Sequence, residues 1–458
     1  MSVNSRFIDY FSENFFQNKP KELHEFLCAI EKPILRSIRI KPDKIHQVKE
    51  NLEKDGWILN PTNINGVFSM DRQGDFDPIE RRLGFSSDHL LGNFYIQEFA
   101  ATHPVDILAN SRINTESFLI LDMAASPGGK TTQLAEYFPN SFIIANEPTR
   151  ERLPQLLQNL ERMGSTHIGI TLYPWQLYKN YKETFDRILL DAPCSGEWTL
   201  FKGTDAAKHW HLKNIKEIAR LQTKLLDAGL HALKIWGEMI YSTCSLNLLE
   251  NEWVLKTMEE KYGNAFEIIF QKKFWPHIDK TGWFFVAKIR KIQSLKSQKN
   301  EETDYETVWR WKKTESKFQI THNKELRLFR GNISPWNVQE WIVLYEHEWK
   351  ILAIKNNNTG SCILDKLFLM RYGEQIGIIE HGKFSPGNRA WRCLNMNTIN
   401  TYNISNITEL DNYLRWEQIH NMGEDLYIAI AYNKQILWLE YRKWNIISNT
   451  FSHEWRRK

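Results

Sequence analysis

The chain has 458 residues, of which 42% are hydrophobic and 25% are charged, and its formal net charge is +4. These values are ordinary for a soluble globular protein, and the length allows two or three domains, each with its own core. No apolar run reaches the roughly 20 residues that a membrane-spanning helix needs, and the N-terminal stretch lacks the apolar core of a signal peptide. We therefore expect a cytoplasmic protein that does not enter a membrane.

The cysteines argue against two common kinds of structural site. Five of them are scattered along the chain without a CxxC pair, namely Cys28, Cys194, Cys244, Cys362 and Cys393. This spacing predicts neither a disulfide framework nor a zinc site, so we expect a reducing compartment and no bound metal. The small net charge permits RNA binding through local patches but does not predict it.

Residues 1–95 have the pattern of a small α/β module. Lys21–Ile30 is predicted to form a short amphipathic helix, and Leu35–Ile40 alternates like a strand. This strand carries Arg36 and Arg39. Two interpretations stay open for these arginines: they lie on a solvated face, or they contact phosphate groups.

From residue 96 to residue 292, apolar strands alternate with helices, which is typical of a parallel, doubly wound sheet. The predicted strands are Phe118–Met123, Ser141–Glu147, Ile168–Leu172, Asp186–Asp191, Glu238–Cys244 and Phe284–Arg290. In such a sheet, ligands bind outside the carboxyl ends of the strands. The residues that follow these strands are therefore the candidates for a functional site.

The last third of the chain has a different character. Residues 293–325 are rich in Lys, Glu, Ser and Gln and poor in aliphatic side chains, so we expect a linker there. From residue 326 to residue 458, short β-like runs alternate with polar turns, and the tail is basic and aromatic. This pattern predicts a β-rich C-terminal region.

A loop of small residues follows the first strand of the predicted sheet. Its members are Ala124, Ala125, Ser126, Pro127, Gly128, Gly129 and Lys130. Small residues before a helix let the backbone approach a ligand, and the helix N-terminus offers free N–H groups. The loop is not a P-loop, because a Walker motif needs glycine where Ala124 stands, and the pattern GxGxxG is absent. We expect a nucleoside-type site, with Glu147 placed to bind ribose hydroxyls, although a tight turn without a ligand is the alternative.

Two cysteines follow later strands: Cys194 in DAPCSG, after Asp191, and Cys244 in STCS. A methyltransferase that acts on an exocyclic amine would need an aromatic residue where Cys194 stands, whereas a thiol suits a pyrimidine ring. A thiolate that adds to carbon six of cytosine makes carbon five nucleophilic, an acid at ring nitrogen three stabilises the adduct, and a base removes the carbon-five proton. Two thiols and Asp191 would supply these roles, although a single cysteine is often only a small buried hydrophobe.

Three runs, LDMAASPGGKTTQL, FDRILLDAPCSGE and YSTCSLNLLENE, resemble the signature motifs of the Sun/Fmu-type RNA 5-methylcytosine methyltransferases, and among them the bacterial small-subunit rRNA subgroup RsmF. FYIQE upstream and FWPHIDKTGWFFVAKIRK downstream fit the same order. The resemblance implies an α/β fold whose Rossmann-like, S-adenosylmethionine-dependent methyltransferase core spans residues 96–292. It also implies an RNA-binding N-terminal module (residues 1–95) and a PUA-like RNA-binding region within residues 326–458.

The resemblance also implies roles for individual residues. Cys244 of the Thr-Cys-Ser motif would be the nucleophile, and Cys194 of the Pro-Cys motif would assist product release. S-adenosylmethionine would be held by the Ala124–Lys130 loop, by Glu147 and near Asp191. The family has an acidic residue that contacts the adenine in the segment that corresponds to residues 173–175, but this chain has Pro174 where Asp is expected.

The activity that the resemblance implies is methylation of carbon five of a cytosine in RNA, with 16S rRNA as the favoured substrate and a monomer as the expected state. A tRNA cytosine methyltransferase and a non-catalytic RNA-binding ribosome-assembly factor are the alternatives that stay open.

Tryptophan stands at several places where the family pattern has glycine. These are Trp198, Trp236 and Trp283, and Trp175 and Trp438 look similar. The chain has 18 Trp and 22 Gly, whereas average usage of about 7% would give roughly 32 Gly. One hypothesis explains both deviations: the gene uses UGA for glycine and was translated with UGA as Trp. True substitution in a divergent enzyme is the alternative, and the codons decide between them.

Overall fold

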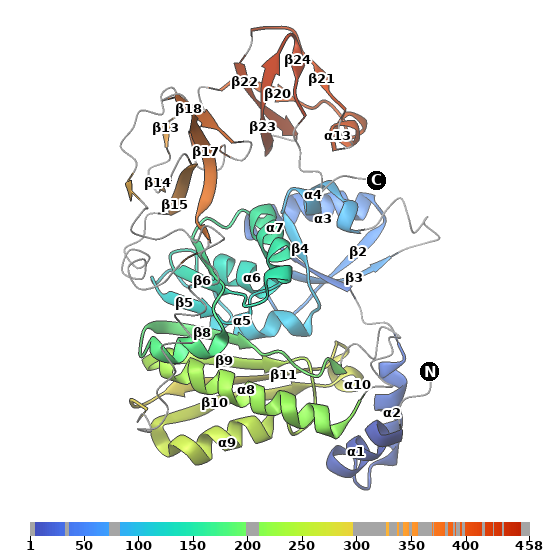
Figure 1. Ribbon diagram of the computed structural model, residues 1–458. Coiled ribbons are helices and arrows are strands. Elements are labelled where there is room, and N and C mark those ends of the chain that lie inside the picture. The colour runs from blue at the N-terminus through green and yellow to red at the C-terminus, as the bar shows by residue number, and fades with distance from the viewer. Residues whose placement is uncertain are drawn as a thin grey trace.

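The computed structural model describes residues 5–295 apart from residues 33–35, 73–82 and 198–209, and shorter stretches between residues 327 and 449 (Figure 1). Within this part of the chain, no helix is long and apolar enough to cross a membrane. The cysteines Cys362 and Cys393, and nearly all of the predicted linker 293–325, lie outside the described residues.

An eight-stranded sheet forms the centre of the molecule, in the order β10-β11-β9-β8-β5-β6-β7-β16. Its strands are β5 (Leu119–Asp122), β6 (Phe142–Asn146), β7 (Ile168–Thr171), β8 (Phe185–Asp191), β9 (Leu233–Thr243), β10 (Phe266–Phe274), β11 (Phe284–Lys291) and β16 (Arg371–Tyr372). Strands β9, β8, β5, β6 and β7 run parallel to one another. The predicted parallel sheet is thus confirmed, and antiparallel strands β11, β10 and β16 extend it at both sides.

Helices cover both faces of this sheet, which explains why its parallel strands are apolar along their whole length. One face packs against α8 (Leu212–Ala232), α9 (Glu252–Tyr262) and η5 (Trp175–Asn180), and the other against α5 (His103–Leu108), α6 (Gly129–Tyr137) and α7 (Leu153–Met163). The strand order reverses at β5, since β6 and β7 lie on one side of it and β8 and β9 on the other. Ligands bind at such a switch point, off the carboxyl ends of the strands.

The N-terminal module is a separate antiparallel sheet in the order β2-β3-β1-β4. Its elements are β1 (Arg36–Ile40), α3 (Ile45–Lys54), β2 (Trp57–Pro61), β3 (Val67–Arg72) and β4 (Phe94–Ile96). The helices α1 (Ser5–Phe15) and α2 (Pro20–Ile30) lie elsewhere: Phe7, Phe11 and Phe26 pack against Trp210 and Trp283 of the central part. The predicted helix and strand of this region are thus confirmed, but they serve two different clusters.

Arg39 fits neither interpretation drawn from the sequence. Its side chain is 1% exposed, so it lies neither on a solvated face nor where an RNA phosphate outside the protein could reach it. Its guanidinium donates to Glu136 Oε2 at 2.9 Å and to Thr132 Oγ1 at 2.8 Å, both on α6. Arg39 therefore ties the N-terminal sheet to the helix that follows the Ala124–Lys130 loop, whereas Arg36 is exposed.

The C-terminal region is rich in strands, as predicted. One five-stranded sheet contains β12 (Arg327–Leu328), β14 (Ile342–His347), β15 (Lys350–Lys355), β17 (Glu374–Glu380) and β18 (Lys383–Pro386). A second contains β20 (Thr401–Asn403), β22 (Leu426–Tyr432), β23 (Gln435–Lys443), β24 (Ile446–Ile447) and β21 (Ile419–His420), beside α13 (Ile407–Leu414). The likeness to a PUA domain stays a prediction.

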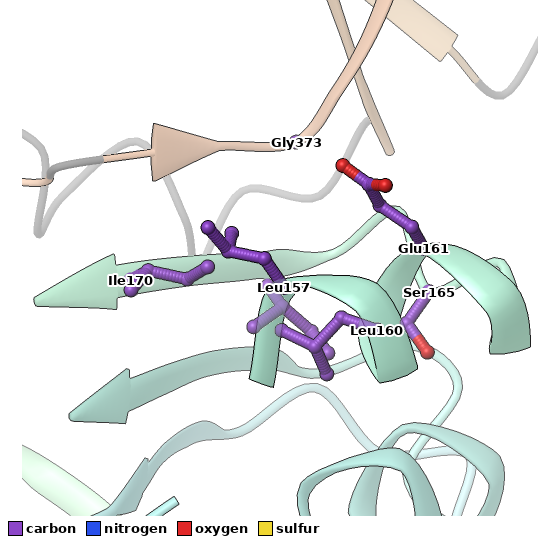
Figure 2. Close-up of a pocket in the computed structure, with 7 residues that line it drawn as sticks. Leu157, Leu160, Glu161, Ser165, Ile170 and Gly373 are labelled. Carbon is purple, nitrogen blue, oxygen red and sulfur yellow. The ribbon is translucent and has the colours of Figure 1, made fainter. Parts of the chain in front are cut away.

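A C-terminal segment also completes the central sheet. In β16, Arg371 and Tyr372 pair with Ile170 and Gly169 of β7, and the nearby Leu369 is fully buried. A pocket lies beside this contact (Figure 2), lined mostly by aliphatic side chains of α7 and β7 and by Gly373. None of the predicted site residues lines it, so it is not the site that the sequence predicts.

The tryptophans of the recoding hypothesis differ in their backbone. Trp236 has φ +65° and a side chain that is 65% exposed, so its backbone has the conformation that favours glycine. Trp444, which the sequence analysis did not single out, also has a positive φ of 55°. Of the remaining positions, Trp175, Trp283 and Trp438 have no positive φ, and Trp198 lies outside the described residues.

Candidate active site

Two cysteine-bearing loops leave the carboxyl edge of the sheet side by side. Strand β8 pairs in parallel with β9, with Asp191 opposite Ser242, so the segments that follow them start from neighbouring positions. This brings the Cα atoms of Cys194 and Cys244 to 6.4 Å from each other. The predicted meeting of the two cysteines is thus observed in the geometry.

The two sulfur atoms form a disulfide, which the sequence analysis did not expect. Spacing alone could not show it, because the partners are 50 residues apart and meet only through the pairing of β8 with β9. Cys28, on α2, is a free thiol.

Asp191 connects the cysteine loops to the loop after β5. Its Oδ2 accepts a hydrogen bond from Lys130 Nζ at 2.7 Å, and its Oδ1 accepts one from Ser242 Oγ at 2.8 Å. The Lys130 ammonium also lies 5.3 Å from the centre of the Phe284 ring. Asp191 and Lys130, predicted from separate motifs, are therefore direct partners.

The Ala124–Lys130 loop is held close to α7. Gly128 precedes α6 with φ +105°, and a Cβ atom there would lie 3.2 Å from Leu156 Cδ1. Asn159 Nδ2 donates to the carbonyl oxygen of Pro127 at 2.9 Å. Glycine at position 128 is thus favoured by the backbone angle, and a Cβ atom there would require Leu156 to shift slightly.

Glu147 lies at the end of β6, fully buried, and its environment includes an arginine that the sequence analysis missed. Its Oε1 accepts a hydrogen bond from the Thr149 backbone N–H at 2.9 Å, and its Oε2 lies 3.5 Å from Arg152 Nη1. Arg152 also donates to the carbonyl oxygen of Ser126 at 2.7 Å, and half of its side chain is exposed. Arg152 therefore connects the two predicted parts of the cofactor site.

Asp122 is a second acid that the sequence analysis did not assign to the site, although it ends an apolar strand. It is 1% exposed and accepts a hydrogen bond from Thr131 Oγ1 at 2.6 Å. Burial, and to a smaller degree the negative charge of Asp191, raise the pKa of Asp122 to about 7. Asp122 is therefore half-protonated near neutral pH.

The free hydrogen-bond acceptors at this edge suit a ligand with hydroxyl and amino groups. Within the described residues, two buried carboxylate oxygens accept no hydrogen bond, namely Asp122 Oδ1 and Glu147 Oε2, and they end the adjacent strands β5 and β6. Buried acceptors in a protein usually have a partner, so a bound ligand is a natural explanation for both. Pro174, which stands where an acid is expected from the sequence, directly precedes η5, and Tyr173 beside it is buried.

Glu98 joins the upstream motif FYIQE to the downstream motif KTGWFF in space. Its Oε1 accepts hydrogen bonds from Thr281 Oγ1 at 2.7 Å and from the backbone N–H groups of Gly282 and Ala100 at 2.9 and 3.0 Å. FYIQE and KTGWFF thus meet at one carboxylate. No group of three or more His, Cys, Asp or Glu side chains that could hold a metal occurs in the part of the chain that the structure describes.

Comparisons with known proteins point to one family. The family model described as 16S rRNA methyltransferase RsmB/F matches residues 110–290. A curated relative from Aeromonas hydrophila, named ribosomal RNA small subunit methyltransferase F, is 36% identical over 318 residues, which cover 64% of this chain and 66% of the relative. A protein of the same name from a Shewanella species is 34% identical over 328 residues, covering 66% and 65% of the two chains.

A solved structure supports the fold. The crystal structure of a methyltransferase homologue from Pyrococcus horikoshii is 27% identical, has a TM-score of 0.54, and covers 63% of this chain and 95% of its own. The methyltransferase-type fold expected from the sequence is thus confirmed. The chain spans slightly less than two thirds of the length of the curated relatives that it matches. The motifs, the fold and the matched segment agree, and residues 110–290 are similar to the 16S rRNA methyltransferase RsmB/F family.

Proposed function

We propose that this protein transfers a methyl group from S-adenosylmethionine to carbon five of a cytosine in RNA, with 16S rRNA as its substrate. The observation that carries the proposal is the meeting of Cys194 and Cys244 at the carboxyl edge, with Cα atoms 6.4 Å apart. Asp191 precedes Cys194 in the same loop and links it, through Lys130, to the loop after β5. The names of the curated relatives, small subunit methyltransferase F, support the choice of rRNA.

The chemistry requires both cysteines as thiols, so the reaction needs the reduced protein. The Cys244 thiolate adds to carbon six of the cytosine, which places a negative charge on carbon five and ring nitrogen three. After methylation, the Cys194 thiolate takes the proton from carbon five, the electron pair of that C–H bond forms the carbon five–carbon six double bond, and the bond between Cys244 and carbon six breaks so that the Cys244 thiolate leaves with its electron pair. We assign assistance of this release to Cys194, the only other cysteine at the site within the described residues.

S-adenosylmethionine, when bound, supplies an electrophilic methyl group. The residues that would hold it are the Ala124–Lys130 loop, Glu147 and Asp191, and we add Asp122. The free acceptors on Asp122 and Glu147 suit its hydroxyl and amino groups. Arg152 lies against Glu147, so it would have to share or release that carboxylate when a ribose binds.

The roles of the flanking regions belong to the same proposal. The N-terminal sheet (within residues 1–95) and the PUA-like C-terminal region (residues 326–458) would bind RNA around the central domain (residues 96–292), with 293–325 as a linker. We propose that the protein acts as a monomer in the cytoplasm, where rRNA is processed.

The test uses two cysteine variants and one matched control, under reducing conditions with small-subunit rRNA. Cys244→Ala should abolish methylation, because no nucleophile activates carbon five. Cys194→Ala should accumulate a covalent protein–RNA adduct that survives denaturing gel electrophoresis, because release is impaired. Cys28→Ala, a free thiol on α2, should behave like the wild type.

Three outcomes would contradict the proposal. An active Cys244→Ala variant would make Cys194 the nucleophile. Bisulfite sequencing of rRNA and tRNA from cells with and without the gene identifies the substrate: loss of methylation at a tRNA cytosine alone would replace rRNA by tRNA, and no loss in either RNA would favour a non-catalytic assembly factor.

A further inference from the structure

Two buried carboxylates follow the cysteines in the same two loops, and the proposed reaction does not use either of them. Glu197 is 2% exposed and follows Cys194 in the loop after β8, and Glu250 is fully buried and follows Cys244 in the loop after β9. Burying two carboxylates next to each other is costly unless their oxygens are hydrogen-bonded. The partners of these oxygens therefore indicate what the pair is for.

Glu250 binds the loop of the other cysteine. Its Oε2 accepts the backbone N–H of Ser195 at 2.8 Å, and its Oε1 accepts the Ser195 hydroxyl at 2.5 Å. Gln222 Nε2, on α8, donates at 2.9 Å both to Glu250 Oε2 and to the carbonyl oxygen of Pro193. The residues on either side of Cys194 are thus fixed to the loop that carries Cys244.

Glu197 makes the reciprocal connection. Its Oε2 accepts the backbone N–H of Leu246 at 2.9 Å, and its Oε1 accepts Asn247 Nδ2 at 2.9 Å, both from the loop after Cys244. Trp210 Nε1 donates to the same Oε1 at 2.9 Å. Asn247 Nδ2 also donates to Glu250 Oε1 at 2.6 Å, so one amide joins the two carboxylates.

We infer that Glu197 and Glu250 are positioning residues, which set the separation of the two cysteines by holding each cysteine loop to the other. Each loop offers a carboxylate to a backbone N–H and to a side chain of its neighbour, so neither loop can shift without breaking bonds in both. The need for this separation rests on the proposed function, since one thiol must attack the base and the other must serve the same base. The geometric claim itself does not depend on which substrate is used.

The protonation state of the pair is consistent with this arrangement. Burial, followed by the negative charge of Glu250, raises the pKa of Glu197 to about 7. Glu250 accepts from four donor groups, whereas Glu197 accepts from three. One proton on Glu197 therefore relieves the repulsion without removing any acceptor that Glu250 supplies.

The test measures how closely the two thiols are held. The reduced protein is treated with diamide, which takes two electrons and two protons from Cys194 and Cys244 and leaves a disulfide. To measure the rate, the remaining thiols are alkylated at successive times and the masses of the products are determined by mass spectrometry. Glu250→Gln and Glu197→Gln each place an amide N–H₂ among hydrogen-bond donors. We expect each to slow disulfide formation about 10- to 100-fold, since a misplacement of about 1 Å has effects of that size.

A matched control separates positioning from stability. Glu238, in the middle of β9 and five residues before Thr243, is also a buried carboxylate, and it pairs with Lys288 and Arg290 at 3.0 and 2.9 Å. Glu238→Gln should lower the melting temperature, as Glu250→Gln and Glu197→Gln should, but it should leave the rate of disulfide formation unchanged. The milder Ser195→Ala variant, which removes only the hydroxyl bond to Glu250, should slow the reaction by a smaller factor and guards against misfolding of the other variants.

Methylation kinetics supply a second readout. Glu250→Gln and Glu197→Gln should lower kcat and leave the KM for S-adenosylmethionine unchanged, because the cofactor loop is not touched. Wild-type rates of disulfide formation in both variants, or an equal slowing by Glu238→Gln, would overturn the inference. A wild-type protein that methylates no RNA would overturn the proposed function instead, and the disulfide assay would still decide the positioning role.

Discussion

Trp236 has a backbone conformation that favours glycine. We predict that the protein with glycine at this position is more stable than the protein with alanine. With φ +65°, Trp236 lies in the left-handed region, which costs an L-residue about 1–2 kcal/mol. Glycine avoids that cost but loses about 0.5–1 kcal/mol more backbone entropy on folding. The difference predicts that Trp236→Gly is more stable than Trp236→Ala by about 0.5–1 kcal/mol. The partial burial of the indole is lost in both variants and cancels.

Both variants are unfolded in urea, and their unfolding is monitored by the circular dichroism of the backbone rather than by tryptophan fluorescence. Trp253 provides the control, because it lies in α9 with 41% of its side chain exposed. There the order should reverse, with Ala more stable than Gly by about 0.5–1 kcal/mol. Trp236→Ala as stable as Trp236→Gly would refute the argument from the backbone angle.

The same position tests the hypothesis of recoded glycine. If UGA stands for glycine in this gene, the codons at positions 236 and 444 should be UGA, since both residues have positive φ. Trp283 is different, because its ring lies 5.8–6.4 Å from those of Phe7, Phe11 and Phe26, and a glycine would leave that space empty. UGG codons at positions 198, 236 and 283 would end the hypothesis.

Three further predictions concern the central domain and its contact with the N-terminal sheet. Lys130→Ala removes the 2.7 Å bond to Asp191 and should weaken S-adenosylmethionine binding about tenfold, or about 1.4 kcal/mol, in calorimetric titration; an unchanged Kd would contradict the assignment of the loop. Arg39→Ala leaves Glu136 buried without its cation and should lower the free energy of unfolding by about 3 kcal/mol, whereas exposed Arg36→Ala should change it by less than about 0.5 kcal/mol. Asp122 has a folded-state pKa of about 7 against an ordinary value of 3.8, so the folded state binds more protons between these values and stability should fall as pH rises from about 4 to 7. Asp122→Asn should flatten that part of the stability profile, and an identical profile in wild type and variant would show that Asp122 is not the titrating group.

The parts of the fold that could be predicted are those that local patterns encode. The continuous apolar runs of β5, β6 and β8 identify strands covered on both faces, and the loop residues after β5 and β8 follow from the rule for open sheets. The partner of Arg39 could not be predicted, because Glu136 is 97 residues away and nothing in a strand pattern distinguishes a buried arginine from an exposed one.

The site shows the same division. Cys194, Cys244 and Asp191 could be predicted because thiols and carboxylates at strand ends are recognisable one at a time. The contacts between them were not: the bond from Lys130 to Asp191 spans 61 residues, and that from Glu250 to Ser195 spans 55. Arg152 and Glu197 gave no signal of their own, since an arginine after a strand and a glutamate in a loop are usually solvated.

Strand β16 determines where the chain can be truncated without exposing an edge of the central sheet. The family match ends at residue 290, yet the strand that covers the edge of β7 comes from residues 371–372, in the C-terminal region. A chain cut after residue 290 would expose the backbone N–H and C=O groups of β7 and the surface that Leu369 buries, and such open edges recruit other chains. A self-contained form of this chain is therefore longer than the segment that the family model matches, because the C-terminal region also covers the edge of the central sheet.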